Sequence, residues 1–84
     1  MMNYTQCETI LKIMLENPSK EWWSAKDFQK SKYFIGYEAT ARMSDLIRKY
    51  PKLFNIEKDG RFRIIAINWD NVKMVRQFKK LFDL

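Results

Sequence analysis

The side chains that most often carry out chemistry in proteins are scarce in this chain of 84 residues. It contains no histidine, which removes the commonest general base and the commonest metal ligand together. Its one cysteine, Cys7, can form neither an intramolecular disulfide nor a thiolate zinc site. We therefore expect a protein that binds a partner and is not an enzyme, with no cofactor and no metal.

Carboxylates and glycines offer two further routes to chemistry, and neither has the spacing that the chemistry needs. Asp27, Asp45 and Asp59 do not follow a metal-ligand pattern that would serve a magnesium-dependent nuclease. Gly36 and Gly60 stand too far apart to form a loop that cradles phosphates. We expect no small-molecule substrate, and each aspartate has a local structural explanation.

The chemistry that the chain does offer is electrostatic. It carries 16 Lys and Arg against 10 Asp and Glu, a net charge of +6. The excess is uneven, because residues 1–50 hold 8 cations and 6 acids whereas residues 51–84 hold 8 cations and 4 acids. A polyanion such as nucleic acid is favoured as the partner over a merely solubilising surface. With no signal-like start and no apolar run near about 18 residues, we expect a cytoplasmic protein without membrane contact.

The densest basic cluster falls on a β-hairpin expected over residues 53–67. A two-residue Asp-Gly turn would place Lys58 opposite Arg61, two like charges. A three-residue loop with a left-handed Gly60 pairs Glu57 with Arg61 instead, and we prefer this register. It places four apolar residues on one face, which are Phe54, Ile56, Phe62 and Ile64.

In this register Asp59 is a turn residue, and the tip over residues 57–63 presents Lys58, Arg61 and Arg63. Such a cluster suits contact with a phosphate backbone or a minor groove. Exposed charges on a hairpin often serve only solubility, which is the alternative.

A helix expected over residues 37–50, ended by Pro51, carries the second candidate surface. One arc is apolar and faces a core, through Ala39, Met43, Leu46, Ile47 and Tyr50. The opposite arc and its flanks bear small and hydrogen-bonding side chains suited to base edges and phosphates. The DNA contacts expected there are Tyr37, Thr40, Ala41, Arg42, Ser44 and Arg48. A plain solvent face is the alternative, because Glu38 with Arg42 and Asp45 with Lys49 form favourable i, i+4 ion pairs.

The segments before this helix are expected to build the core. Residues 4–16 form an amphipathic helix with a stripe of Cys7, Ile10, Leu11 and Met14. A short extended piece over residues 21–23 leads to a helix over 25–30, with Ser24 and Asp27 as a capping box and Trp23 and Phe28 as a hydrophobic staple. The pair Trp22 and Trp23 could instead be a base-stacking platform, which the staple makes the weaker interpretation. An apolar connector follows over residues 30–36, through Tyr33, Phe34 and Ile35.

A closing helix is expected over residues 69–83, capped by Asn68 or Asp70. Its apolar stripe runs through Val72, Val75, Phe78 and Phe82, and Met74 and Leu81 broaden it. The surplus apolar surface either forms a homodimer seam that matches a two-fold DNA site or fills a small core.

This order of elements, with TQCETIL at residues 5–11 and GYEATARMSDL at residues 36–46, resembles the winged helix-turn-helix domain of small phage and prophage DNA-binding proteins. The resemblance covers residues 4–67 of a single domain, 1–84. It implies an α+β, mainly α fold with a three-helix core, a β-hairpin wing and an extra C-terminal helix.

By the same resemblance the helix from Tyr37 is the recognition helix in the major groove, Arg42 matches the family's arginine, and the wing lies on the backbone of duplex DNA. The implied role is a small phage-type or bacterial transcriptional regulator. A winged helix module that binds proteins and not DNA is the alternative. The connector before Gly36 is longer than the family's turn, which affects the angle between the two helices that it joins.

Overall fold

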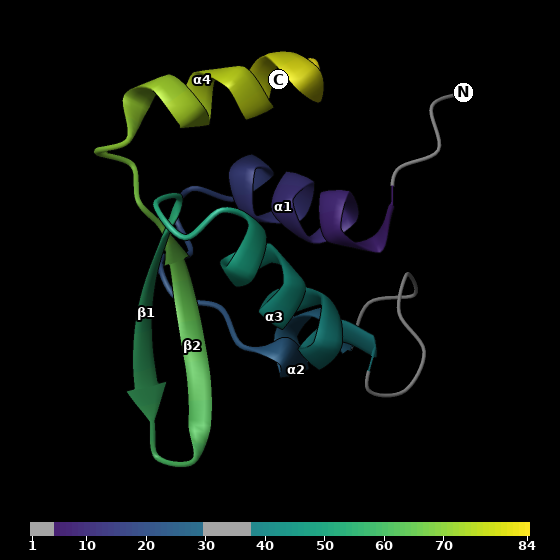
Figure 1. The fold of residues 1–84 in the computed structure, drawn as a ribbon, viewed down its shortest axis with the longest axis vertical. Coiled ribbons are helices and arrows are strands. Elements are labelled where there is room, and N and C mark those ends of the chain that lie inside the picture. Colours follow the sequence, from purple (N-terminus) through teal and green to yellow (C-terminus); the bar gives the residue numbers. More distant parts are fainter. Residues whose placement is uncertain (1–4, 30–37) are drawn as a thin grey trace.

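The computed structural model describes residues 5–29 and 38–84, which form an α+β fold. The elements are α1 (Gln6–Glu16), α2 (Ala25–Gln29), α3 (Glu38–Lys49), β1 (Phe54–Asp59), β2 (Phe62–Ile67) and α4 (Val72–Leu81). Figure 1 shows the hairpin of β1 and β2 extending beside α2 and α3, with α4 at the opposite end of the molecule from the hairpin tip. The predicted class, element order and C-terminal helix are confirmed, whereas the connector over residues 30–36 and Tyr37 lie outside the described residues.

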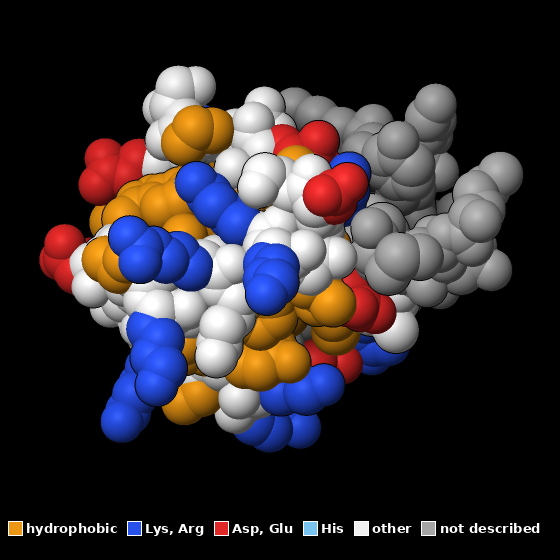
Figure 2. All heavy atoms as spheres, turned by 90° about the horizontal axis from the view of Figure 1, so that it is seen from above, with side chains coloured by type: hydrophobic (Ala, Val, Ile, Leu, Met, Phe, Trp, Pro, Cys, Tyr) orange, Lys and Arg blue, Asp and Glu red, His pale blue; other side chains and the backbone are white. Residues whose placement is uncertain are grey.

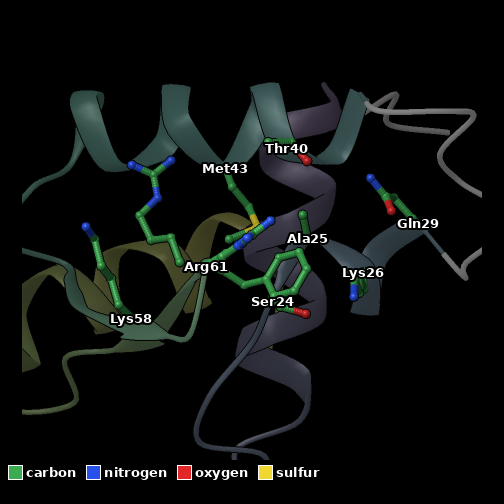
Figure 3. A pocket seen from close by; sticks show the side chains of 10 residues that line it. Ser24, Ala25, Lys26, Gln29, Thr40, Met43, Lys58 and Arg61 are labelled. Carbon is green, nitrogen blue, oxygen red and sulfur yellow. The ribbon is translucent and has the colours of Figure 1, made fainter.

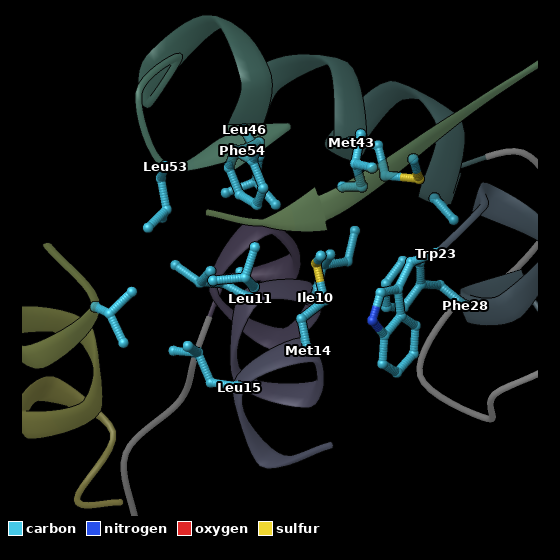
Figure 4. Packing of buried hydrophobic residues seen from close by; sticks show 14 of the residues in the cluster. Ile10, Leu11, Met14, Leu15, Trp23, Phe28, Met43, Leu46, Leu53 and Phe54 are labelled. Atoms are coloured by element: carbon cyan, nitrogen blue, oxygen red, sulfur yellow. The ribbon is translucent and has the colours of Figure 1, made fainter. Parts of the chain in front are cut away.

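Helix α1 is fixed by its first turn and by its buried face. The Thr5 hydroxyl accepts the Glu8 N–H at 3.1 Å, and the Glu8 carboxylate accepts the Thr5 N–H at 3.0 Å, which is a reciprocal capping box. Three residues of the expected apolar stripe are buried, namely Ile10, Leu11 and Met14; Cys7 is only partly buried, and Leu15 is buried in addition. These residues form the centre of the core in Figure 4, with residues from α3, the hairpin and α4 around them.

The staple that begins α2 is confirmed. Trp23 and Phe28 are both buried, and their rings stack with centroids 5.2 Å apart and planes at 11°. The Trp23 indole N–H donates to the Lys20 carbonyl at 3.0 Å, so this tryptophan belongs to the core and not to a stacking platform. The Asp27 carboxylate accepts the Ser24 N–H at 2.7 Å, which is the acidic half of the expected capping box.

The short extended segment between α1 and α2 attaches the hairpin to the helices. Trp23 forms an isolated antiparallel bridge with Ile65, with both backbone hydrogen bonds at 2.8 Å. Because Ile65 is fully buried, this bridge sets the edge of β2 against the helical core. The hairpin is therefore held at its base, and its tip projects past α2 and α3 (Figure 1).

Neither hairpin register expected from the sequence is correct. Asp59 pairs with Phe62, so Gly60 and Arg61 form a two-residue turn and Asp59 is the last residue of β1. Gly60 has φ of +64°, and Arg61 does not have positive φ, which is typical of a turn with glycine at its first central position. The left-handed conformation expected for Gly60 is confirmed, but Gly60 is the first residue of a two-residue turn and not the last of a three-residue loop.

Glu57 pairs with Ile64 and not with Arg61, a shift of three residues, and because this number is odd it changes the face of every side chain in β2. Phe54 and Ile56 share a face with Ile65 and Ile67, whereas Phe62 lies on the other face and is 52% exposed. The expected apolar face of Phe54, Ile56, Phe62 and Ile64 is therefore wrong. The new register also places Lys58 directly opposite Arg63, a pairing of like charges that the expected register had avoided.

Replacing Gly60 by alanine is expected to lower the free energy of unfolding by about 1–2 kcal/mol, because an added Cβ penalises the left-handed conformation. No heavy atom lies within 4 Å of the position that this Cβ would occupy, so the cost is conformational and not steric. Urea denaturation followed by circular dichroism measures the change. Asn tolerates the left-handed region better than alanine, so Gly60→Asn should be the milder variant; equal stability of wild type and G60A would contradict the assigned turn.

The start of the C-terminal helix also differs from the expectation. Asn71 is the cap, because its side chain accepts the Met74 N–H at 3.4 Å, and α4 is shorter than the predicted 69–83. Asn68 instead accepts the Asp70 N–H at 3.3 Å within the preceding turn. Val75 and Phe82 are buried, and Tyr50 of the loop after α3 meets the ring of Phe78 edge-on, with the ring centroids 4.9 Å apart.

Among the described residues, none of the helices has the length and hydropathy that crossing a bilayer requires.

Candidate nucleic-acid interface

A groove of about 520 Å³ opens between α2, α3 and the tip of the hairpin (Figure 3). Its floor is largely apolar, and cationic side chains from two of the three elements surround it. None of the ten described residues that line it is acidic; they are Ser24, Ala25, Lys26, Gln29, Thr40, Met43, Lys58, Arg61, Phe62 and Arg63. The groove therefore combines apolar surface with concentrated positive charge.

One hydrogen bond joins the hairpin to α3. The Arg63 guanidinium donates to the Ser44 hydroxyl across 19 residues of sequence. Together with the bridge at Trp23, this contact places the cations of the hairpin beside α3. The guanidinium of Arg63 stays exposed, so it retains donors for an anion after binding Ser44.

On the α2 side of the groove, a cation lies over an aromatic ring. The Lys26 ammonium of α2 lies 3.9 Å from the centroid of the Phe62 ring, which is cation–π geometry. Phe62 itself is about half exposed, although large apolar residues in a chain this small are needed for the core. Lys26 and Phe62 were not among the residues expected to form the site.

The contacts expected on the third helix divide between two sides of α3. Thr40, Ala41 and Arg48 are exposed, and Thr40 lines the groove. Arg42 lies on another flank, where its Nε is 3.0 Å from the Asp45 carboxylate and its carbonyl accepts the Cys7 thiol at 3.7 Å. Asp45 therefore pairs with Arg42 and not with Lys49 as expected, and the side chain of Glu38 is not among those described.

The structure thus brings Thr40, Lys58, Arg61 and Arg63 together around one groove, with Ser44 bonded to the last of them. It keeps Ala41 and Arg48 on the exposed arc of α3 and sets Arg42 apart from the groove, while Tyr37 lies outside the described residues. Of the expected contacts, Arg42 is the one whose charge is already compensated within the protein.

A second hollow of about 410 Å³ lies between α1, α3 and α4 and contains the thiol of Cys7. Burial raises the pKa of the Cys7 thiol above its usual value, and the nearby Asp45 carboxylate adds to the increase. The raised pKa keeps the thiol protonated at neutral pH, which is typical of a structural cysteine and not of a nucleophile.

The residues that sequence reasoning missed lie where α2 meets the hairpin. Lys26 and Phe62 are 36 positions apart in the chain, and no local spacing connects them. They meet because the Trp23–Ile65 bridge holds β2 beside α2, so that the start of β2 lies next to the start of α2. Only the correct register of the hairpin could have indicated that the side chain of Phe62 lies outside the core.

Within residues 5–29 and 38–84, no group of three or more Cys, Asp or Glu side chains is placed to hold a metal ion. Comparisons of the chain with models of protein families, with curated proteins and with solved structures find no match. The geometry and charge of the groove are therefore the basis on which a function can be assigned.

Proposed function

We propose that this chain is a small winged helix domain that binds duplex DNA without catalysing a reaction. In this proposal α3 enters the major groove, and the hairpin acts as the wing and lies on the phosphate backbone. The observation that carries the proposal is the hydrogen bond from Arg63 to Ser44, which holds a cationic hairpin beside the exposed arc of α3. The role that we propose for such a domain is transcriptional regulation of the phage or bacterial type.

Two further features support this proposal. The order of α1, a bridging segment, α2, α3 and a hairpin is that of a winged helix, and the bridge from Trp23 to Ile65 places the hairpin against the helices. The groove beside α3 carries Lys26, Lys58, Arg61 and Arg63, a concentration of charge that suits a phosphate backbone.

The direct test is binding of a mixed-sequence duplex, measured by fluorescence anisotropy over a range of salt concentrations. If three hairpin cations contact phosphates, the slope of log K against log salt should be about −3 or steeper. A duplex that causes no anisotropy change even at low salt would end the proposal. Mapping of chemical shifts with the same duplex should perturb α3 and the hairpin tip together.

Replacing Arg48 by alanine is expected to change which sequences the protein prefers. Arg48 is exposed on the arc of α3 that would face base edges, where a bidentate contact is worth about 1–3 kcal/mol of discrimination between bases. Selection from a pool of randomised duplexes measures the preference.

Lys49→Ala is the matched control for this variant, because it removes the same charge from the neighbouring residue. Lys49 lies on the side of α3 that borders the second hollow, with its ammonium 5.5 Å from the Tyr50 ring centroid. Its loss should leave the selected sequences unchanged. Identical selections for R48A and wild type would show that Arg48 does not contact bases.

A second candidate function is docking of a protein, or of a second copy of this chain, on α4. Val72, Leu81 and Leu84 are about half exposed, which is unusual for aliphatic side chains in a small domain. In Figure 2, which views the molecule from its α4 end, apolar side chains lie between Lys and Arg side chains. An apolar interface should be insensitive to salt, whereas DNA affinity should fall steeply. Sedimentation equilibrium of the free protein detects the homodimer.

A further inference from the structure

Phe62 occupies a position that folding alone does not explain. It is the first residue of β2, lies on the face of the hairpin opposite to Phe54 and Ile65, and is 52% exposed. Its ring contacts a cation of α2 instead of the core. An exposed aromatic ring that borders a groove is a surface for stacking.

The groove beside this ring has the size and lining of a ligand site. Its volume of about 520 Å³ falls in the range of roughly 300–1,000 Å³ that is usual for small-molecule sites. Ala25, Met43 and Phe62 supply apolar surface, and Thr40 adds a hydroxyl. A planar, apolar group with polar edges fits this combination better than a sugar or a simple anion does.

The charge around the groove indicates that the planar group carries phosphate. Lys26 of α2 lies over the ring, and three more cations line the groove from the hairpin, namely Lys58, Arg61 and Arg63. A nucleotide provides both parts, because its base offers a π-face to Phe62 and its phosphate offers a counter-charge to Lys26. A base in the interior of a duplex has both faces covered by its neighbours, whereas an unpaired base beyond the last pair can enter the groove alone and stack.

We propose that the groove between α2, α3 and the hairpin holds an unpaired nucleotide at the end of a bound duplex, with its base stacked on Phe62 and its phosphate among the four cations. This inference rests on the proposed duplex binding. The protein then prefers a duplex that carries a single-stranded extension to a fully paired one. Phe62 is the residue that distinguishes the two.

The test compares three fluorescent probes with the full-length protein: a blunt duplex, the same duplex with a short thymidine extension on either strand, and that duplex with abasic nucleotides in the extension. Stacking of one or two bases on aromatic rings predicts that wild type binds the thymidine extension roughly 5- to 100-fold more tightly than the blunt end. The abasic extension keeps the added phosphates but removes the bases, so it should be bound little better than the blunt duplex.

The variants assign the preference to the ring. Phe62→Leu should lose the preference for the extension over the blunt duplex, whereas Phe62→Trp should keep it. Ile56→Leu is the control, because Ile56 is 47% exposed on the same hairpin but does not line the groove. Circular dichroism verifies that each variant is folded.

The two proposals fail in different ways. Equal wild-type affinity for the blunt and extended duplexes, a preference that survives in F62L, or equal binding of the abasic and thymidine extensions overturns the stacked nucleotide and leaves duplex binding intact. Absence of binding to the blunt duplex at low salt overturns the proposed function itself, and with it the inference that rests on it.

Discussion

Replacing Lys58, Arg61 and Arg63 together by alanine is expected to lower the affinity for every duplex on the order of 100-fold at about 0.1 M salt. All three cations line the groove beside α3, and each is exposed. Each phosphate contact releases about 0.9 of a bound counterion, so the slope of log K against log salt should become shallower by about 2.7. Sequence preference should be retained, because phosphate contacts carry no base information. Anisotropy titrations at several salt concentrations measure both quantities.

A triple variant of α4 provides the matched control. Lys73, Arg76 and Lys80 are also exposed, and their replacement by alanine lowers the net charge by the same amount. They lie on the helix at the opposite end of the molecule from the hairpin tip (Figure 1), and salt at about 0.1 M screens exposed charges beyond about 10 Å. Equal losses of affinity in the two triple variants would show that net charge, and not the hairpin, attracts the duplex.

Replacing Phe28 by alanine is expected to cost about 3–5 kcal/mol of unfolding free energy. Phe28 is 1% exposed and stacks on the buried ring of Trp23, so its removal leaves a cavity and deprives that ring of its partner. A domain of this length has roughly 4–13 kcal/mol of total stability, so a large part of the margin is lost. The midpoint of urea denaturation, followed by circular dichroism, should fall accordingly. Because Trp23 bridges to Ile65, DNA affinity should decline with stability.

Phe62→Leu is the control for this stability effect, since it also shortens a phenylalanine, but one that is half exposed. Its unfolding free energy should stay within about 0.5 kcal/mol of the wild-type value. A loss as large as that of F28A would mean that the hairpin tip belongs to the cooperative core, contrary to its exposure.

The helices could be predicted from the sequence because their signals are local. The stripe of Ile10, Leu11 and Met14 repeats with the helical period, and Trp23 and Phe28 have the spacing of a staple. The cap of α4 was missed, although Asn71 is of a suitable type, because Asn68 and Asp70 are equally suitable and stand nearby. Propensity alone does not choose among three neighbouring candidates.

The hairpin and the groove were harder to predict because they depend on contacts between distant segments. The expected register avoided like charges across the strands, but the structure pairs Lys58 with Arg63. Burial of Ile65 and its bridge to Trp23 outweigh the repulsion of exposed charges, which is a small term. The place of Lys58, Arg61 and Arg63 on the hairpin could therefore be predicted, whereas the contact between Lys26 and Phe62 depended on a register that local patterns did not reveal.

The pairing of Lys58 with Arg63 has a thermodynamic consequence for the free protein. Two positive charges at opposite positions of paired strands repel each other, so this pairing destabilises the tip of the hairpin when no anion lies between them. A bound anion reduces this repulsion, so binding of an anion in the groove stabilises the pairing of β1 with β2. Dissolved salt therefore has two opposite effects. It screens the repulsion in the unbound protein, which stabilises the hairpin, and it competes with a polyanion for the same side chains, which weakens binding.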